Sequence, residues 1–317
     1  MSHNAPQRTV PVDICVCTYQ RAHLEQTLRS LAALELPSQV RLRIVVADND
    51  AQPSAKALVD ALANELPVAL HYIHCPASNI SLARNACLEA AQGTFLAFID
   101  DDSTATPRWL AELIAVAEAT GADAVLGPVR AIYSPSAPGW MRRGDFHSTG
   151  PVWVDGEIRT GYSGNVLLRR ASPHVEGRRF NLALGRSGGE DTEYFAQLHR
   201  SGGRIAYAPD ALACEPVTPQ RARFFWLARR RFRSGQTHAR LLAAEPVSPL
   251  PQAGLAAVKA AFSFCAALAF IAVPHRRNRQ ILRGIMHAGV AGGLLGLREA
   301  RLYGDEPAKG QTPCSLT

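Results

Sequence analysis

Apolar runs alternate with amphipathic segments through the first 130 residues of the chain. The apolar runs predict buried strands, at Val12–Cys17, Leu42–Ala47, Val68–Ile73, Thr94–Ile99 and Ala122–Ile132. Segments with one apolar face predict helices between them, at residues 24–31, 53–62, 81–92 and 107–120. Near-continuous apolar strands separated by helices are typical of a parallel sheet covered by helices on both faces. The sequence therefore predicts an α/β fold.

Polar side chains follow three of these strands at the point where each strand ends. Thr18 and Tyr19 follow the first strand, Asp-Asn-Asp at 48–50 follows the second, and three aspartates at 100–102 follow the fourth. In open α/β sheets, ligands bind beyond the carboxyl ends of the strands. We therefore expect a ligand site where these clusters meet.

The pattern weakens beyond residue 133. Residues 133–189 are rich in Gly, Pro and Arg, and we interpret them as loops and short strands. A helix is predicted over Glu190–Arg200, then a short strand over Arg204–Tyr207 and an arginine-rich helix over Arg221–Ser234.

The chain changes character again beyond Leu250. Residues 254–273 are apolar apart from Lys259 and a few small polar residues, and a second, glycine-rich apolar stretch covers 284–297. The basic sequence HRRNR, at 275–279, lies between them. A membrane span needs about 20 apolar residues, so the first stretch is long enough. We prefer a partly inserted or interfacial hairpin, while packing against the main domain and a true span stay open.

Positive charge is concentrated in the C-terminal third. From residue 199 onward there are 17 Lys/Arg against 6 Asp/Glu, whereas the first 198 residues hold 17 against 21. A basic segment of this kind suits an anionic membrane, a diphosphate or a nucleic acid. Seven cysteines without CxxC spacing, and no signal-like N-terminus, predict reduced thiols and a cytosolic domain.

The three aspartates at 100–102 are the most informative local feature. Adjacent carboxylates repel one another and are costly unless a cation binds beside them. Mg²⁺ and Mn²⁺ favour few protein carboxylates combined with substrate phosphates, so Asp100 and Asp102 are candidates to hold such an ion on a diphosphate. The other interpretation is a turn whose acids cap the next helix, and the cluster alone fits both.

A second acidic cluster, Gly188-Gly189-Glu190-Asp191, opens a predicted helix. A helix N-terminus favours the ionised form of an acid. A carboxylate held near a sugar hydroxyl can act as a general base. Helix capping explains the same residues and, for this cluster alone, is the simpler explanation.

These two clusters, in this order after this strand and helix pattern, resemble family 2 of the inverting glycosyltransferases. The resemblance covers residues 12–235 and is carried by ICVCTYQR, IVVADND, NISLARNACLEAAQGTFLAFIDDDS and GEDTEYFAQLHRSGG. Bacterial exopolysaccharide transferases of the succinoglycan-synthesis type are the most similar in style, because they also carry a basic helix and an apolar tail.

The resemblance implies the GT-A fold, a Rossmann-like and mostly parallel sheet with helices on both faces, plus a helical C-terminal appendage that associates with a membrane. We divide the chain into a flexible N-terminus (1–11), a GT-A domain (12–242) with a nucleotide-binding half (12–132) and an acceptor half (133–242), a helical membrane-associating region (243–303) and a flexible tail (304–317).

Donor-binding roles are also implied by the resemblance, for Thr18, Tyr19, Arg21, Asp48, Arg84, Asp100 and Asp101. Asp48 would accept a hydrogen bond from the uracil ring, and Arg84 would place its guanidinium near the diphosphate. The sequence Gly-Tyr-Ser-Gly-Asn at 161–165 resembles the loop beneath the donor sugar and the acceptor.

The resemblance likewise implies the metal and the base. Asp102 would bind Mn²⁺ or Mg²⁺ directly, while Asp100 would face the ribose or the metal. Asp191 would be the catalytic base, with Glu190 beside it as an orienting or acceptor-binding group. Many relatives complete the metal site with a later histidine, for which Glu215 is the candidate here. The alternative for Glu215 is a surface residue before a proline.

The arginine-rich segment from 221 to 233 interleaves arginines with aromatic residues. Three interpretations stay open: Arg230 or Arg233 contacts the leaving diphosphate, the helix face meets anionic lipid headgroups, or the face is solvated and basic with buried aromatics. The chain lacks the QxxRW motif of processive polysaccharide synthases, which favours transfer of a single sugar.

The sequence thus predicts transfer of a sugar from a nucleotide-sugar, with a UDP-sugar favoured, onto an acceptor hydroxyl with inversion. We expect a glycan or lipid-linked oligosaccharide acceptor in exopolysaccharide or cell-surface glycan synthesis, at the cytoplasmic side of the inner membrane, and no nucleic acid partner. The alternatives are a metal-dependent nucleotidyltransferase, although TYQRAH is no phosphate-binding loop, and a non-catalytic membrane- or nucleic-acid-binding scaffold.

Overall fold

A seven-stranded sheet forms the centre of the molecule in the computed structural model, which describes residues 9–244 and 248–298. In sheet order the strands are β11 (Ile205–Tyr207), β6 (Ala124–Leu126), β10 (Asn165–Arg169), β4 (Phe95–Ile99), β1 (Val10–Thr18), β2 (Val40–Asp48) and β3 (Ala69–His74). Within the described residues, β10 is the only strand of this sheet that runs antiparallel to its neighbours. The predicted mostly parallel sheet is confirmed.

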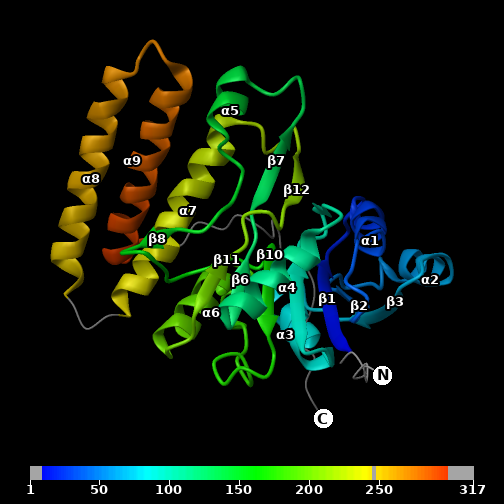
Figure 1. The fold of residues 1–317 in the computed structure, drawn as a ribbon. Helices are drawn as coiled ribbons and strands as arrows, with labels where there is room; N and C mark the ends of the chain where they lie inside the picture. The colour runs from blue at the N-terminus through cyan, green and yellow to red at the C-terminus, as the bar shows by residue number, and fades with distance from the viewer. Residues whose placement is uncertain (1–8, 245–247, 299–317) are drawn as a thin grey trace, which may run out of the picture.

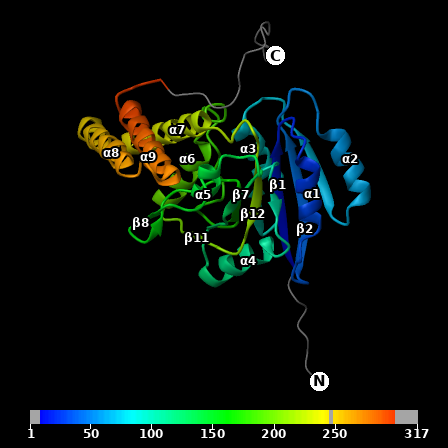
Figure 2. The same ribbon diagram turned by 90° about the horizontal axis from the view of Figure 1, so that it is seen from above.

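Helices cover both faces of the sheet. One face packs against α1 (Leu24–Ala32), α2 (Lys56–Glu65) and α4 (Trp109–Thr120), and the other against α3 (Ile80–Ala90) and α6 (Glu190–Arg200). Side chains alternate between the two layers along each strand. In β1, Ile14 and Val16 pack in the first layer and Cys15 in the second. Figure 2 shows α1 and α3 on opposite sides of β1.

The strand predicted over residues 122–132 is wrong, because two strands of different sheets share this segment. β6 ends at Leu126, and β7 (Val129–Tyr133) belongs to a small sheet of order β5-β12-β7. The break falls at Gly127 and Pro128. A Cβ on Gly127 would lie 2.5 Å from the carbonyl oxygen of Ala211, and Pro128 has no N–H to donate to a ladder. The strands β5 (Thr104–Ala105) and β12 (Ala213–Val217) complete this unpredicted sheet.

The middle segment contains short elements, as expected. They are α5 (Gly139–Gly144), β8 (Trp153–Val154) and β9 (Glu157–Ile158). The arginine-rich helix α7 is longer than predicted and covers Phe224–Ala243. It reaches the end predicted for the catalytic domain.

Two long helices, α8 (Pro249–Ala269) and α9 (Pro274–Leu294), lie beside α7 at the edge of the molecule farthest from β1–β3 (Figure 1). α9 packs closely against α7, since a Cβ on Gly289 would overlap the backbone of Phe232. The basic residues 275–279, which lie between the two apolar stretches in the sequence, form the first turns of α9. Within the described chain, α8 alone is long and apolar enough to cross a membrane.

The predicted flexible ends fall mainly outside the described residues. Of the segment 1–11, Val10 and Pro11 already belong to β1, so this strand begins two residues earlier than expected. The tail 304–317 and the last residues of the predicted appendage lie outside the described ranges.

Candidate active site

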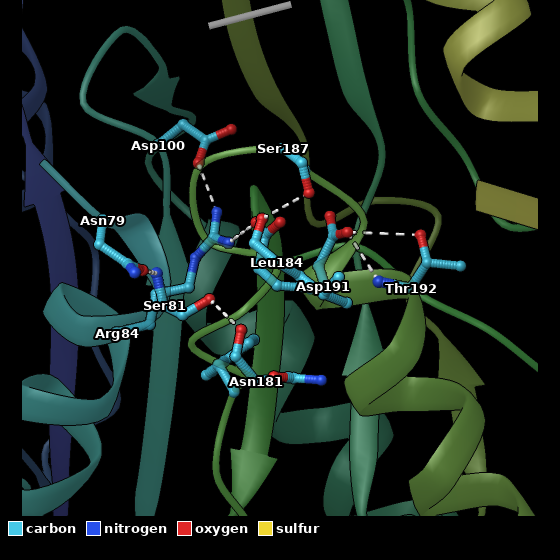
Figure 3. Close-up of polar contacts among 12 residues, drawn as sticks. Asn79, Ser81, Arg84, Asp100, Asn181, Leu184, Ser187, Asp191 and Thr192 are labelled. Atoms are coloured by element: carbon cyan, nitrogen blue, oxygen red, sulfur yellow. Dashed lines mark hydrogen bonds and ion pairs between the residues drawn. The ribbon is translucent and has the colours of Figure 1, made fainter. Parts of the chain in front are cut away.

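Arg84 joins the two acidic clusters that the sequence singled out. Its helix α3 begins at Asn79, whose side-chain oxygen accepts hydrogen bonds from the N–H groups of Ser81 and Leu82 and so caps the helix. The Arg84 guanidinium donates a hydrogen bond to Glu190 Oε1, and its Nη2 lies 4.0 Å from Asp100 Oδ1 (Figure 3). The end of β4 and the start of α6 therefore meet at a single guanidinium.

The Arg84 side chain is buried, with 10% of its surface exposed. Burial works against its charge, but the carboxylates of Glu190, Asp191 and Asp100 outweigh this effect and raise the pKa of Arg84. The guanidinium is therefore a permanent positive charge between the two acids. It holds Asp100 and Glu190 together despite their mutual repulsion.

Asp100 remains partly open to solvent, with 47% of its side-chain surface exposed. Its pKa is nevertheless raised to about 7, because the surrounding protein desolvates it and because Asp102, Glu215 and Asp101 repel its charge. The predicted loop at 161–165 passes directly beside it. A Cβ on Gly164 would lie 2.5 Å from Asp100 Oδ2, so a residue without a side chain is needed here.

Asp191 lies in the first turn of α6. Its Oδ1 accepts hydrogen bonds from the backbone N–H and the hydroxyl of Thr192, at 2.7 and 3.3 Å. Burial and the charge of Glu190 raise the pKa of Asp191 to about 6, against the effect of Arg84. Glu190 is 5% exposed, and its Oε2 has no hydrogen-bond partner among the described residues. Asp191 is thus a carboxyl group that can accept a proton, and Glu190 beside it is held by Arg84.

The loop before α6 needs its two glycines. Gly188 and Gly189 have φ of +87° and +89°, a region that residues with side chains avoid. A Cβ on Gly189 would also lie 2.8 Å from Thr237 Cγ2 of α7. Arg233 of α7 is 3% exposed and donates hydrogen bonds to the carbonyl oxygens of Ser187 and Gly188, at 3.0 and 2.7 Å. Arg233 is therefore a brace for the loop that leads into α6 and Asp191, and its contact with the diphosphate stays a prediction.

The remaining aspartates bind the loop after β1. The backbone N–H of Tyr19 donates to Asp101 Oδ2 at 3.4 Å, and Arg21 Nε donates to Asp101 Oδ1 at 3.2 Å. The same guanidinium lies 3.6 Å from Asp102 Oδ2. Burial raises the pKa of Asp101. The side chains predicted at the first and fourth strand ends are therefore in contact, with Thr18 buried next to them at the end of β1.

Arg221 is a site residue that the sequence did not single out. It donates a hydrogen bond to Glu215, and its Nη2 lies 3.4 Å from Asp102 Oδ2. Burial and the charge of Asp102 raise the pKa of Glu215. Glu215 therefore belongs to the acidic cluster and is not an isolated surface residue. The signal available in the sequence was that Arg221 begins the arginine-rich segment and follows Glu215 by six residues.

Asp48 lies at the end of β2. It is 0% exposed. Its carboxylate accepts hydrogen bonds from the N–H groups of Asp50 and Ala55, at 3.1 and 2.8 Å, and from the Tyr72 hydroxyl at 2.9 Å. These hydrogen bonds hold the loop after β2 against the Asp48 carboxylate, and the contact of Asp48 with uracil stays a prediction. A pocket of about 140 Å³ opens beside this loop, lined by Thr18, Gln20, Arg21, Leu24, Ser54, Ala55 and Leu58.

The donor set at the sheet edge fits a divalent cation that also binds a diphosphate. No group of three protein ligands is preformed in the described parts of the chain. Asp100 and Asp102, two positions apart at the end of β4, would nevertheless supply oxygen ligands, and Mg²⁺ sites of this kind use one or two carboxylates together with substrate phosphates. Arg230, the last predicted donor-binding residue, lies farther along α7, with its guanidinium over the ring of Trp226 at 5.3 Å from the centroid.

Comparisons with known proteins show the family of the chain. The model of the family described as Glycosyl transferase family 2 matches residues 13–173. The succinoglycan biosynthesis protein ExoM of Rhizobium meliloti is 57% identical over 94% of this chain and 97% of its own.

Two solved structures are similar in fold. The mannosyltransferase PcManGT from Pyrobaculum calidifontis, in complex with GDP-Man and Mn²⁺, matches with a TM-score of 0.56 and 19% identity over 92% of this chain and 75% of its own. S. aureus TarS in complex with UDP-GlcNAc matches with a TM-score of 0.53 and 16% identity over 89% of this chain and 91% of its own. The expected GT-A fold is confirmed. The chain belongs to glycosyl transferase family 2 and is a glycosyltransferase.

Proposed function

We propose that the chain transfers one sugar from a nucleotide-sugar, with a UDP-sugar favoured, to an acceptor hydroxyl with inversion of configuration. The observation that carries this proposal is the contact of Arg84 with both Asp100 and Glu190. Because one guanidinium holds an acid of the donor cluster and the neighbour of Asp191, a sugar bound at Asp100 lies within reach of Asp191. The two similar structures named above contain GDP-Man and UDP-GlcNAc. They support a nucleotide-sugar donor, and they do not distinguish a UDP-sugar from a GDP-sugar.

Mn²⁺ or Mg²⁺ would be held by Asp100 and Asp102, with Glu215 as a third candidate ligand. When bound, the ion neutralises negative charge that develops on the leaving diphosphate. Arg21 keeps Asp101 and Asp102 in place at this edge, and Arg84 adds a fixed positive charge beside Asp100.

Asp191 acts as the general base in this proposal. Its pKa of about 6 leaves it ionised near neutral pH, while it stays basic enough to accept a proton. It removes the acceptor hydroxyl proton as that oxygen attacks the anomeric carbon from the face opposite the diphosphate. A single displacement of this kind inverts the configuration. Glu190 keeps Arg84 between the two acids, and its second oxygen is a candidate acceptor contact.

The acceptor we propose is a lipid-linked oligosaccharide at the cytoplasmic face of the inner membrane. The outer side of α8 supports this, because large apolar side chains are exposed along it: Leu255, Val258, Phe262 and Leu268 are 57–71% exposed. Lys259 is exposed on the same helix. An apolar face with basic residues is typical of helices that lie in the membrane interface. α9 packs against α7, so the helix pair attaches this face to the catalytic domain.

The test is sugar transfer by the full chain, with UDP-, GDP- and TDP-sugars and Mn²⁺, followed through release of the nucleoside diphosphate. We expect release from one nucleotide class, dependence on the metal and loss of transfer in Asp191→Asn. Asp210→Asn changes an exposed aspartate outside the site and serves as the matched control. Transfer at the wild-type rate by Asp191→Asn would contradict the assignment of the base.

A further inference from the structure

A second pocket, of about 200 Å³, lies between α7 and the loop that follows α5. It is lined by residues 146–150 of this loop and by Arg230, Arg231 and Ser234 of α7. Arg230 and Ser234 are four residues apart and therefore share one face of the helix. The lining combines two guanidinium groups with hydroxyl groups and backbone.

The two arginines of this pocket differ from those of the acidic cluster. In the described residues no carboxylate lies within 4.0 Å of either guanidinium, and the Arg230 charge acts on Glu215 only at longer range. Arg21, Arg84 and Arg221, by contrast, each contact acids. Arg231 donates to the carbonyl oxygen of Phe146 at 3.4 Å. Burial and the charge of Arg230 lower the pKa of Arg231. Two like charges beside one pocket repel each other, and the attraction of both to an anion between them would offset this repulsion.

His147 forms part of the wall without adding charge. Its Nδ1 pairs with the Tyr133 hydroxyl and its Nε2 with the carbonyl oxygen of Arg221, both at 3.0 Å. Burial lowers its pKa to about 4, so it is neutral near pH 7. The positive charge of the pocket therefore comes from Arg230 and Arg231.

The pocket lies one tryptophan away from the acidic cluster. Trp226 stacks on His147 with ring centroids 5.4 Å apart, and the Arg221 guanidinium lies 5.8 Å from the centroid of the Trp226 ring. On the other side, Arg279 of α9 donates to the carbonyl oxygen of Gly144 at 2.9 Å. The pocket is thus lined by α7, which in Figure 1 lies between the sheet and the pair α8 and α9.

We propose that this pocket binds the phosphoryl group, a phosphate or diphosphate, that links the acceptor glycan to its lipid. Paired guanidinium groups recognise phosphoryl oxygens through charge-assisted hydrogen bonds. The inference rests on the proposed function, because it assumes a lipid-linked acceptor. The same chemistry could come from the donor diphosphate, which would use Arg230 as the sequence predicted. The separation by Trp226 favours the acceptor.

Binding to two probes distinguishes the sources. Farnesyl diphosphate in neutral detergent is a lipid diphosphate without sugar, and UDP with Mn²⁺ represents the donor. In the full chain, we expect Arg231→Gln to weaken farnesyl diphosphate binding about tenfold or more, as loss of a charge-assisted hydrogen bond requires, and to change the Kd of UDP less than about twofold. Arg142→Gln, which removes an exposed arginine of α5, is the control for loss of charge.

A second pair of variants does not depend on removing a half-buried arginine. Ser234 is exposed at the pocket, so Ser234→Asp adds a negative charge there, and Ser234→Asn adds the same volume without charge. We expect Ser234→Asp to weaken farnesyl diphosphate binding far more than Ser234→Asn does. Equal weakening of UDP and farnesyl diphosphate would overturn the proposal and assign the pocket to the donor, and unchanged farnesyl diphosphate binding in both Arg231→Gln and Ser234→Asp would overturn it outright.

Failure of this inference is distinguishable from failure of the proposed function. If the wild-type chain transfers sugar but does not bind farnesyl diphosphate, the pocket proposal is wrong and the transferase mechanism stands. If the wild-type chain releases no nucleoside diphosphate from any nucleotide-sugar, the proposed function itself is wrong.

Discussion

The sheet edge and the α7–α9 region differ in whether their arginines are paired with carboxylates. At the sheet edge, Arg21, Arg84 and Arg221 each contact carboxylates of the same chain, so acids outnumber the arginines that hold them. In the α7–α9 region, Arg230 and Arg231 face a pocket without acids in the described residues, and apolar side chains of α8 are exposed. The first arrangement suits a cation and its diphosphate, and the second suits an anionic, partly apolar partner.

Charge therefore separates the two substrates in this account. The donor would be held where excess carboxylates need a metal ion, and the acceptor where excess arginines need an anion. The loop 187–189 connects the two regions, because it leads into the first turn of α6, where Asp191 lies, and is held by Arg233 of α7. Variants in each region should consequently affect different substrates.

The largest effect is expected from Asp191→Asn. Loss of a general base costs roughly 10²–10⁴-fold in rate. The donor contacts of the sheet edge remain, so UDP binding with Mn²⁺ should be almost unchanged. Measuring kcat and the Kd of UDP for the same variant checks both statements, and an equal loss in both would show that Asp191 mainly binds the donor.

Arg84→Gln should break the link between the clusters. Removing one partner of a buried ion pair costs about 3–5 kcal/mol, because Glu190 then loses its charged partner. We expect a lower free energy of unfolding in urea together with weaker UDP binding. Arg108→Gln breaks an exposed i,i+4 pair with Glu112 and is the control, for which about 0–1 kcal/mol is expected.

Gly189→Ala tests the brace between α7 and the base. The added Cβ would meet Thr237 at a backbone φ of +89°, and misplacing a catalytic group by about 1 Å costs up to about 10²-fold in rate. We expect kcat to fall while the KM for the donor stays similar. Gly156→Ala is the control. Gly156 has a φ of +81° and open space around it, so an added Cβ there imposes backbone strain without displacing the site.

The exposed face of α8 should control membrane binding and leave donor chemistry unchanged. Replacing Leu255 or Phe262 by Ser should weaken binding to vesicles of phosphatidylethanolamine and phosphatidylglycerol about tenfold each, given roughly 1.5 kcal/mol or more for burying such a side chain. Leu182→Ser changes an exposed leucine outside the helix pair and serves as the control. Vesicle flotation of the full chain is the measurement, and unchanged binding in both variants would remove α8 from the account.

The pH dependence should be the mildest effect. Asp191 works in its ionised form, and its pKa is raised to about 6. At saturating Mn²⁺, which keeps Asp100 ionised, transfer should therefore level off above this value and fall about tenfold per pH unit below it. The measurement is kcat at saturating donor between pH 5 and 8. A flat profile below pH 6 would contradict the role of Asp191, and the residual activity of Asp191→Asn should lack this fall.

Local patterns were sufficient for most of the parallel half of the fold. Apolar runs identified β1, β2, β3 and β4, and the helix start at Glu190 was predicted correctly. The split between β6 and β7 was missed, because its cause lies in close contacts of Gly127 with Asn165 and Ala211, which are distant in sequence.

The candidate site shows the same limit. The acids at 100–102 and 190–191 could be predicted, because local motifs carry them. The contact of Arg221 with Asp102 spans more than 100 residues and has no local signature. The donor contacts expected of Asp48 and Arg233 stay predictions, and the hydrogen bonds of these side chains to backbone groups depend on loop conformations that residue types alone do not determine.

A crystal structure of the Asp191→Asn variant with Mn²⁺ and the UDP-sugar tests the central claim most directly. The account predicts that the diphosphate lies beside Asp100 and Asp102, and that the side chain at position 191 faces the anomeric carbon from the side opposite the leaving oxygen. A donor sugar directed away from position 191, or a diphosphate bound away from these aspartates, would contradict it.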